Sequence, residues 1–426
     1  MTAAAVAERV APSGATPWLP VTLLPDDAFA RVRRRAIFDC CKWDPQVEDV
    51  STLASFALVL RPETWRELAT LAESLAAETL AAERELLGRP ELHARLGLPR
   101  SVRRALANAS RRPTSGAARL IRFDFHHTTD GWRISEANTD VPGGINEGSG
   151  LPGLLEPFYP HAANVGDPAG AYARALLESA NDATIPLVHA TAYSDDRQVM
   201  TYLARRIEAL GGRAALVSPE HLRWPDGRAL LDAGGATEAV AVIARFFPAE
   251  WLPNLPARCG WSSFFAGAAA AVSNPAAAIM TQSKRFPLVW DALETPVPAW
   301  RALLPETRDP RDGSAWRSAD DWVIKPSLGR VGEGVGLRGV TSAKEWRALE
   351  RAATRHADFW VAQRRFEPTH LDACGERLFP CVGVFTVGTR VAGAYGRLAC
   401  RAIIDWRAQD VAVLAATDAT NVERAT

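Results

Sequence analysis

Two short segments that alternate polar and apolar residues carry the side chains best suited to chemistry. Residues 120–126 alternate with a period of two, which is typical of a β-strand with one polar and one apolar face. Residues 132–138 repeat the pattern, and Thr129-Asp130-Gly131 between them indicates a β-hairpin. On the first strand Ile121, Phe123 and Phe125 oppose Arg122, Asp124 and His126; on the second Ser135 and Ala137 oppose Trp132, Ile134, Glu136 and Asn138.

The length of the hairpin loop decides whether the polar side chains meet. A two-residue Asp130-Gly131 turn would pair Asp124 with Ala137 and separate the polar groups. A three-residue loop, with Gly131 in the left-handed conformation closing a bulge, pairs Asp124 with Glu136 and Arg122 with Asn138. We predict this second register, because it gathers the polar groups and leaves the phenylalanines for the core.

Two carboxylates placed opposite each other repel, and this repulsion suggests a bound cation. A hard divalent ion such as Mg²⁺ removes the penalty, since it prefers carboxylate and amide oxygens. The predicted metal ligands are therefore Asp124, Glu136 and Asn138. The alternative is a solvated polar face paired with Arg122. A transition-metal site at His126 and His127 is disfavoured, because neighbouring residues on a strand point to opposite faces.

A glycine-rich loop follows a second segment of interest, Trp322-Val-Ile-Lys325-Pro, which resembles a strand with a lysine inside it. Four glycines, at 329, 332, 334 and 336, allow backbone N–H groups to wrap an anion, and Lys325 at the base of the loop could neutralise phosphate charge. A flexible surface loop is the alternative. Gly334-Val-Gly336-Leu-Arg-Gly339 also matches the dinucleotide motif formally. However, Gly334 comes nine positions after Lys325, and the following helix begins at Ser342, beyond the last glycine.

The bulk composition describes an ordinary globular chain. It has 426 residues, enough for two or three packed subdomains, and 49 basic residues balance 49 acidic ones. This balance gives no reason to expect a nucleic acid or an anionic membrane as a partner. Six scattered cysteines indicate reduced thiols, and no signal peptide or membrane span is evident. We expect a soluble cytoplasmic enzyme whose oligomeric state the sequence does not reveal.

Residue patterns around these segments predict an α+β protein. Pro62 and the spacing of Trp65, Leu68, Leu71 and Leu75 predict a helix that ends near Gly88. Residues 184–218 read as strand, helix, strand, with the helix from Asp196 to Leu210. We divide the chain into a loose tail (1–17), a mainly helical part (18–117), the hairpin with its Gly/Pro loop (118–160), a small α/β subdomain (161–260) and a final α/β part (261–426).

The motifs together resemble those of the glutathionylspermidine synthase family, which are ATP-grasp carbon–nitrogen ligases with a circularly permuted order. Arg-Phe-Asp-Phe at 122–125 and Glu-Ala-Asn-Thr-Asp at 136–140 are similar to that family's metal-binding hairpin. The later elements follow in the family's order. They are Ser283-Lys284, Lys325-Pro326, Gly329-Arg330, Gln363 at the end of a probable strand, and Gly396-Arg397 after another strand. The resemblance covers roughly residues 40–415 and the synthetase part alone.

This resemblance implies a fold, cofactors and residue roles. The fold would be a permuted ATP-grasp with a small pre-ATP-grasp-like subdomain and a helical N-terminal part. ATP and Mg²⁺ would be required, with magnesium on Asp124, Glu136 and Asn138. Residues 329–336, with Gly329, Arg330, Gly332 and Gly334, would form a lid. Lys284 and Lys325 would contact phosphates, Gln363 would lie near the adenine, and Arg122 and Arg397 would stabilise the transferring phosphoryl group and the acyl-phosphate.

The expected function is therefore an ATP- and Mg²⁺-dependent ligase that joins a small-molecule or peptide carboxylate to an amine. The loop reads Gly-Arg-Val-Gly-Glu-Gly, whereas the family more often has an acidic residue directly after the arginine. The residues that would bind the acid and the amine match no pattern, so glutathione and spermidine do not follow as substrates. A nucleotide-binding protein without ligase activity and a phosphotransferase that stops at a phosphorylated product are the alternatives.

Overall fold

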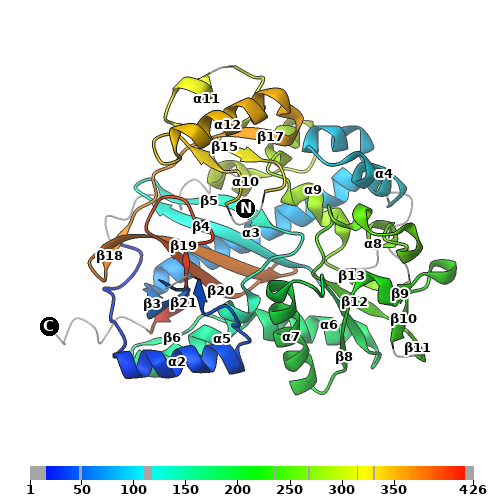
Figure 1. Cartoon of the computed structure of the whole chain (residues 1–426), viewed down its shortest axis with the longest axis horizontal. Coiled ribbons are helices and arrows are strands. Elements are labelled where there is room, and N and C mark those ends of the chain that lie inside the picture. The colour runs from blue at the N-terminus through cyan, green and yellow to red at the C-terminus, as the bar shows by residue number, and fades with distance from the viewer. Residues whose placement is uncertain are drawn as a thin grey trace.

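The computed structural model describes residues 16–47, 50–109, 118–233, 236–266, 269–313, 315–329 and 332–417. A large sheet forms its centre, with the strand order β3-β21-β20-β19-β4-β5 (Figure 1). β3 runs parallel to β21, and the other neighbours along this path are antiparallel. The strands are β3 (Leu53–Leu60), β4 (Leu120–Thr128), β5 (Gly131–Asn138), β19 (Glu376–Val387), β20 (Arg390–Ala399) and β21 (Gln409–Ala416), with β6 (Ala162–Asn164) beside β21 and β18 (Leu371–Ala373) beside β19.

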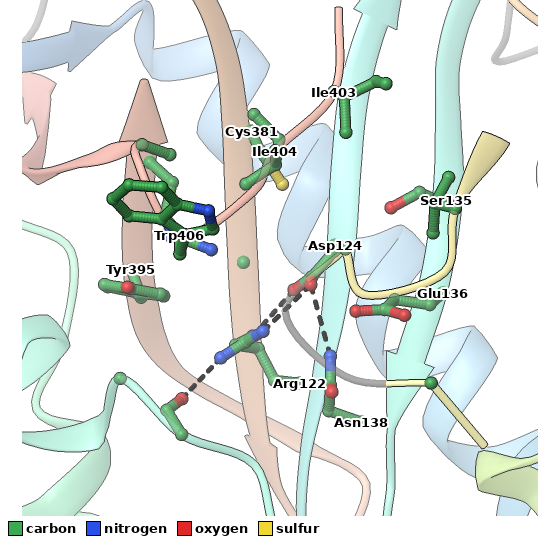
Figure 2. Close-up of a pocket in the computed structure, with 18 of the residues that line it drawn as sticks. Arg122, Asp124, Ser135, Glu136, Asn138, Cys381, Tyr395, Ile403, Ile404 and Trp406 are labelled. Carbon is green, nitrogen blue, oxygen red and sulfur yellow. Dashed lines mark hydrogen bonds and ion pairs between the residues drawn. The ribbon is translucent and has the colours of Figure 1, made fainter. Parts of the chain in front are cut away.

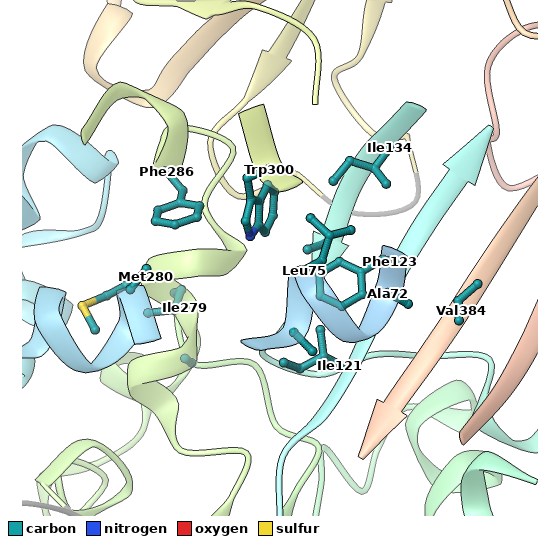
Figure 3. Packing of buried hydrophobic residues seen from close by; sticks show 14 of the residues in the cluster. Ala72, Leu75, Ile121, Phe123, Ile134, Ile279, Met280, Phe286, Trp300 and Val384 are labelled. Atoms are coloured by element: carbon teal, nitrogen blue, oxygen red, sulfur yellow. The ribbon is translucent and has the colours of Figure 1, made fainter. Parts of the chain in front are cut away.

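The long helix α3 (Pro62–Leu87), whose start and end the sequence predicted, covers one face of this sheet. Pro62 occupies the start of the helix, where its missing N–H costs no hydrogen bond, and Gly88 caps the end. Leu68, Leu71 and Leu75 recur on one side of the helix and are buried. Figure 3 shows the resulting core, in which Leu75 lies close to Ile121 and Phe123 of β4, and Trp300 lies beside them. The apolar face of the hairpin is therefore fixed by packing, which leaves its polar face for the site.

The predicted small α/β unit is confirmed as a separate parallel sheet. β7 (Ile185–Val188), α7 (Ser194–Ala209) and β8 (Ala214–Val217) form the expected strand, helix and strand. The sheet continues in the order β13-β12-β7-β8, with β12 (Val242–Arg245) and β13 (Ala271–Ser273).

A buried ion pair attaches this unit to the hairpin. Arg245, at the end of β12, is paired with Asp140, which follows β5, and both side chains are fully buried. The Asp140 carboxylate also accepts a hydrogen bond from the backbone N–H of Ala249 (3.0 Å). A buried pair of this kind depends on both partners, since removing one leaves an uncompensated charge. Asp140, the last residue of the Glu-Ala-Asn-Thr-Asp motif, is thus a structural residue.

A third sheet carries Lys325 and Gln363. Its antiparallel order is β14-β17-β15-β16, with β14 (Thr307–Arg308), β15 (Trp322–Pro326), β16 (Gly336–Leu337) and β17 (Trp360–Arg364). α12 (Ala343–Arg355) packs on it and begins at Ser342, whose hydroxyl accepts the N–H of Glu345 (3.3 Å) as a helix cap. Lys325 lies inside β15 and Gln363 near the end of β17, as predicted.

Other elements complete the mixture of helices and strands expected of an α+β protein. The domain boundaries stay a prediction, although β3 shows that residues 18–117 contribute a strand to the central sheet. All six cysteines lie in the described ranges and are free. Among the described helices, none is long and apolar enough to span a bilayer. The remaining elements are α2 (Asp26–Asp39), α4 (Arg100–Ala109), α5 (Ile145–Leu155), α6 (Pro168–Ala180), α8 (Ser263–Ala266), α9 (Ile279–Gln282), α10 (Pro298–Leu303), α11 (Ala315–Ser318), β1 (Gln46–Val47), β2 (Val50–Ser51), β9 (Leu222–Arg223), β10 (Leu230–Ala233) and β11 (Ala236–Ala239).

Candidate active site

The hairpin has the predicted register at its polar end, but its turn is shorter than predicted and β5 contains an inserted residue. Asp124 is paired with Glu136 and Arg122 with Asn138, which confirms the prediction. The three-residue loop is wrong: Thr128 pairs with Gly131, so the turn contains two residues, Thr129 and Asp130. Gly131 has the predicted positive φ, +89°. The extra residue lies farther along, at Ser135, where the register shifts by one between Phe125 and Asp124.

The irregularity at Ser135 also corrects the predicted faces of β5. Strict alternation put Trp132 and Ile134 on the same face as Glu136, whereas Trp132 and Ile134 are buried in the core and Glu136 lines a cavity. A β-bulge inserts one residue and thereby exchanges the two faces of a strand. It lets the apolar residues of β5 stay in the core while Glu136 and Asn138 join Asp124. The period-two pattern carried no sign of the inserted residue.

Arg122 and Asp124 form a bidentate ion pair in the floor of the cavity. The Arg122 Nε and Nη2 atoms donate to the two Asp124 oxygens at 2.7 and 2.9 Å, and the Asn138 amide donates to Asp124 at 3.2 Å (Figure 2). Burial lowers the pKa of Arg122, but the Asp124 carboxylate more than offsets this and holds it above its usual range. Gly383 of β19 lies opposite Asp124, and a Cβ there would come within 2.8 Å of the Arg122 side chain. The glycine makes the room that the pair needs.

Glu136 lies under the influence of two lysines. Lys284 forms an ion pair with it (3.0 Å) and donates to the Gly329 carbonyl (2.8 Å). Lys325 donates to the Gln363 side-chain oxygen (2.7 Å) and the Ser135 carbonyl (3.2 Å). Burial would raise the pKa of Glu136, but Lys284 and Lys325 outweigh it and lower the pKa to about 2. Burial, aided by Lys284 and opposed by Glu136, lowers the pKa of Lys325 to about 8.

The two histidines separate as predicted. His126 lines the cavity, with its Nε2 atom 3.1 Å from the Ser135 hydroxyl. Burial, together with nearby Lys325, lowers its pKa to about 4. His127 instead lies against Trp18 and Trp132. Within the described ranges they do not share a ligand position.

A cavity of about 610 Å³ collects most of the predicted site residues. Arg397 lines it too, although it lies within β20 rather than after a strand, and it donates to the Asp405 carbonyl (2.8 Å). Gly334 is not among the described residues that line the cavity; it packs near Pro326 and Trp360. Arg330 lies outside the described residues. The predicted residues that line the cavity are Arg122, Asp124, Glu136, Asn138, Lys284, Lys325, Gly329, Gly332, Gln363 and Arg397.

The glycine-rich segment does not have the dinucleotide-binding arrangement. Gly336 and Leu337 form β16, which pairs antiparallel with β15, and α12 begins beyond Gly339. α12 therefore begins after this segment, whereas the dinucleotide motif requires the helix to begin within it. Gly332 (φ +71°) approaches the loop between β20 and β21, since a Cβ there would lie 2.8 Å from the Ile404 carbonyl oxygen. Ile403, Ile404 and Trp406 of that loop line the cavity above Asp124 (Figure 2).

Sequence reasoning missed a second group of charged residues in the same cavity. Lys42 forms ion pairs with Asp410 (2.8 Å), Glu147 (3.1 Å) and Asp44 (3.1 Å). The Tyr395 hydroxyl donates to Asp410 (2.6 Å), and its ring lies 5.3 Å from the Arg122 guanidinium. Tyr395 could have been found, because it is two residues from Arg397 on one strand and so shares its face. Lys42, Glu147 and Asp410 come from three distant segments with no shared pattern.

Comparison with known proteins places the chain in a family. It belongs to the glutathionylspermidine synthase preATP-grasp family, whose profile matches residues 52–413. Membership supports, in general terms, a ligase that joins a carboxylate to an amine. Among functionally curated proteins, none is significantly similar to this chain.

The solved structures that are similar to this chain include two of low sequence identity. A glutathione synthetase-like effector from Globodera pallida, in its apo form, has a TM-score of 0.63 at 12% identity, covering 91% of this chain and 96% of that chain. It therefore shares the fold. A putative gamma-glutamylcysteine synthetase from Methylobacillus flagellatus has a TM-score of 0.42 at 14% identity, covering 76% and 82%, which is too low to indicate a common fold.

Proposed function

We propose that this protein is an ATP- and magnesium-dependent ligase of the circularly permuted ATP-grasp type, forming an amide through an acyl-phosphate. The observation that carries the proposal is the gathering of cations and oxygen ligands in one cavity. Arg122, Lys284, Lys325 and Arg397 all line it together with Asp124, Glu136 and Asn138. An excess of positive charge beside two carboxylates suits a polyphosphate bound with a divalent cation.

The oxygen donors of the hairpin fit magnesium. Asp124 and Glu136 face each other across β4 and β5, with the Asn138 amide 3.2 Å from Asp124. Arg122 and Lys284 now neutralise these carboxylates and would shift towards phosphate oxygens when the metal is held there. The magnesium ion would reduce the negative charge of the phosphates.

The other residues fit nucleotide binding and phosphoryl transfer. Lys284 and Lys325 would contact phosphates, and Gln363, which already orients Lys325, would lie near the base. Gly329 and Gly332 would belong to a lid that closes against the loop carrying Ile404. The lid would exclude water, since an acyl-phosphate hydrolyses readily. The hairpin precedes the lysines in the chain, which is the order that a permuted ATP-grasp would have.

The reaction would proceed in two displacements. A carboxylate oxygen of the acid attacks the γ-phosphorus of ATP, the bond to the bridging oxygen breaks, and ADP leaves. The amine nitrogen then attacks the acyl carbon and the C–N bond forms. The bond between the acyl carbon and the phosphate oxygen breaks, and inorganic phosphate leaves with that oxygen and takes up the proton that the nitrogen loses. Arg122 and Arg397 stabilise the negative charge that develops in both steps.

An ADP-release assay with panels of carboxylic acids and amines tests this proposal. Ligation requires acid, amine and magnesium together, with an amide product that mass spectrometry detects. Release with acid alone, and a phosphorylated acid as product, would instead identify a phosphotransferase. Tight Mg-ATP binding without turnover across the panels would favour a nucleotide-binding protein.

A further inference from the structure

Lys42 is a buried lysine at the part of the cavity away from the hairpin carboxylates. It is 5% exposed, and its ammonium group lies 2.8 Å from Asp410 on β21 and 3.1 Å from Glu147 on α5. Asp44 adds a third carboxylate at 3.1 Å. Burial opposes the charge, but the carboxylates more than offset it and raise the pKa of Lys42, so the lysine stays protonated.

The backbone before Lys42 adopts an unfavourable conformation, and the Lys42 side chain that follows it lines the cavity. Cys41 has a φ of +54°, which L-residues other than glycine rarely adopt because the Cβ atom approaches the following carbonyl. The two backbone N–H groups after Cys41 are fixed: Lys42 donates to the Ala36 carbonyl (2.9 Å) and Trp43 to the Gln198 side chain (3.0 Å). Such conformations persist where the surroundings hold them, and they cluster at functional sites.

Glu147 has a carboxylate oxygen that neither a hydrogen bond nor an ion pair satisfies. Asp410 accepts a hydrogen bond from the Tyr395 hydroxyl and forms an ion pair with Lys42, and the Arg397 Nε atom lies 4.0 Å from it. Glu147 is 6% exposed and receives Lys42 at its Oε1 atom, whereas its Oε2 atom is buried without a hydrogen-bond partner. An unsatisfied buried carboxylate oxygen is costly, and a ligand N–H group would remove that cost. Glu147 also lines the cavity.

We propose that Glu147 binds the amine of the acceptor substrate, and that Lys42 restricts the acceptor to a single ammonium group. Lys42 fills the position between Glu147 and Asp410 that a second substrate ammonium would need. A diamine would bring like charge against Lys42 in a site with little water, which is strongly unfavourable. This inference rests on the proposed function, because it assigns a site to the amine.

Isothermal titration of the full-length chain with two matched probes tests the inference without turnover. The probes are n-butylamine and the diamine of the same length with an amino group at each end. In Lys42→Met we expect the affinity for the diamine, relative to the monoamine, to rise about tenfold over the wild type, since three carboxylates lose their shared partner. Lys42→Arg, which keeps the charge, should leave the ratio unchanged. An unchanged ratio in a folded Lys42→Met protein, with a lower melting temperature alone, would make Lys42 purely structural and overturn the proposal.

A second variant keeps the inference testable where Lys42→Met does not fold. Glu147→Gln keeps the shape and the bond to Lys42 but removes the charge of Oε2, so monoamine affinity should fall about tenfold. Wild-type affinity in Glu147→Gln would refute the amine site. Absence of ADP release with every acid and amine would reject the proposed function. The titrations would still decide the roles of Lys42 and Glu147, because they measure binding and not turnover.

Discussion

The two ends of the cavity differ in which sign of charge is in excess among their side chains. At the hairpin end, Arg122, Lys284 and Lys325 face the carboxylates of Asp124 and Glu136. At the other end, the single ammonium of Lys42 faces three carboxylates.

Buried charges are stable when they are balanced, so each imbalance indicates a missing partner of the opposite sign. The first end therefore suits an anion with a metal ion, and the second suits a small cation. Tyr395 lies between them, since its hydroxyl donates to Asp410 and its ring lies 5.3 Å from the Arg122 guanidinium. This arrangement would bring phosphate and amine to one reacting carbon.

The largest effect is expected from neutralising the hairpin carboxylates. Asp124→Asn or Glu136→Gln should lower magnesium-dependent ADP release by about a hundredfold or more, since one oxygen ligand loses its charge while the shape is kept. Steady-state kinetics over a magnesium titration, with melting curves to confirm the fold, measures this. Near-normal turnover in both variants would remove the metal assignment.

Neutralising Lys284 tests whether the two ends of the cavity bind different substrates. Lys284→Gln should raise the KM for ATP about thirtyfold, because a phosphate contact and the partner of Glu136 are both lost. The KM for the amine should change little. Equal rises in both constants would show that the ends do not act on different substrates.

Filling the space at Gly383 should disturb the hairpin end through packing alone. Gly383→Val places side-chain atoms against Arg122 and should weaken nucleotide binding about tenfold, with a stability loss of about 1–3 kcal/mol. Gly153→Ala is the matched control, since a Cβ there meets nothing within 4 Å. Fluorescence titration with a nucleotide analogue and chemical denaturation give the two quantities. Wild-type affinity in Gly383→Val would show that the Arg122–Asp124 geometry is unimportant.

The smallest effect concerns pH. The pKa of Lys325 is about 8, below its usual value, so the lysine is charged below this pH and neutral above it. Nucleotide affinity should be full below the pKa and fall about threefold between about pH 7.5 and pH 8.5 as the charge is lost. Lys325→Arg, which stays charged, should flatten this profile. A profile that is the same in both proteins would exclude Lys325 as its source.

Local patterns predicted the hairpin end well, because its ligands lie on two adjacent strands. The alternation in residues 120–126 and the gathering of polar groups on one face predicted the pair of Asp124 with Glu136, although the three-residue loop assumed for it is wrong. The turn length and the bulge at Ser135 were not predictable, since two compensating shifts give the same register as one three-residue loop. Helix α3 and the small α/β unit followed from spacing and terminal residues.

The other end could not be predicted, because tertiary structure alone brings it together. Lys42 follows α2, Glu147 lies on α5 and Asp410 on β21, with more than a hundred residues between each. Nothing near Lys42 in the sequence distinguishes it from a surface lysine. Lys42 is distinguished by its burial and by the positive φ of the preceding Cys41, and both are properties of the fold.

A crystal structure with magnesium and a non-hydrolysable ATP analogue tests the central claim most directly. We expect the analogue's phosphates to contact Lys284 and Lys325, and magnesium to bind to Asp124, Glu136 and Asn138. An analogue bound elsewhere, or a metal held by other residues, would contradict it.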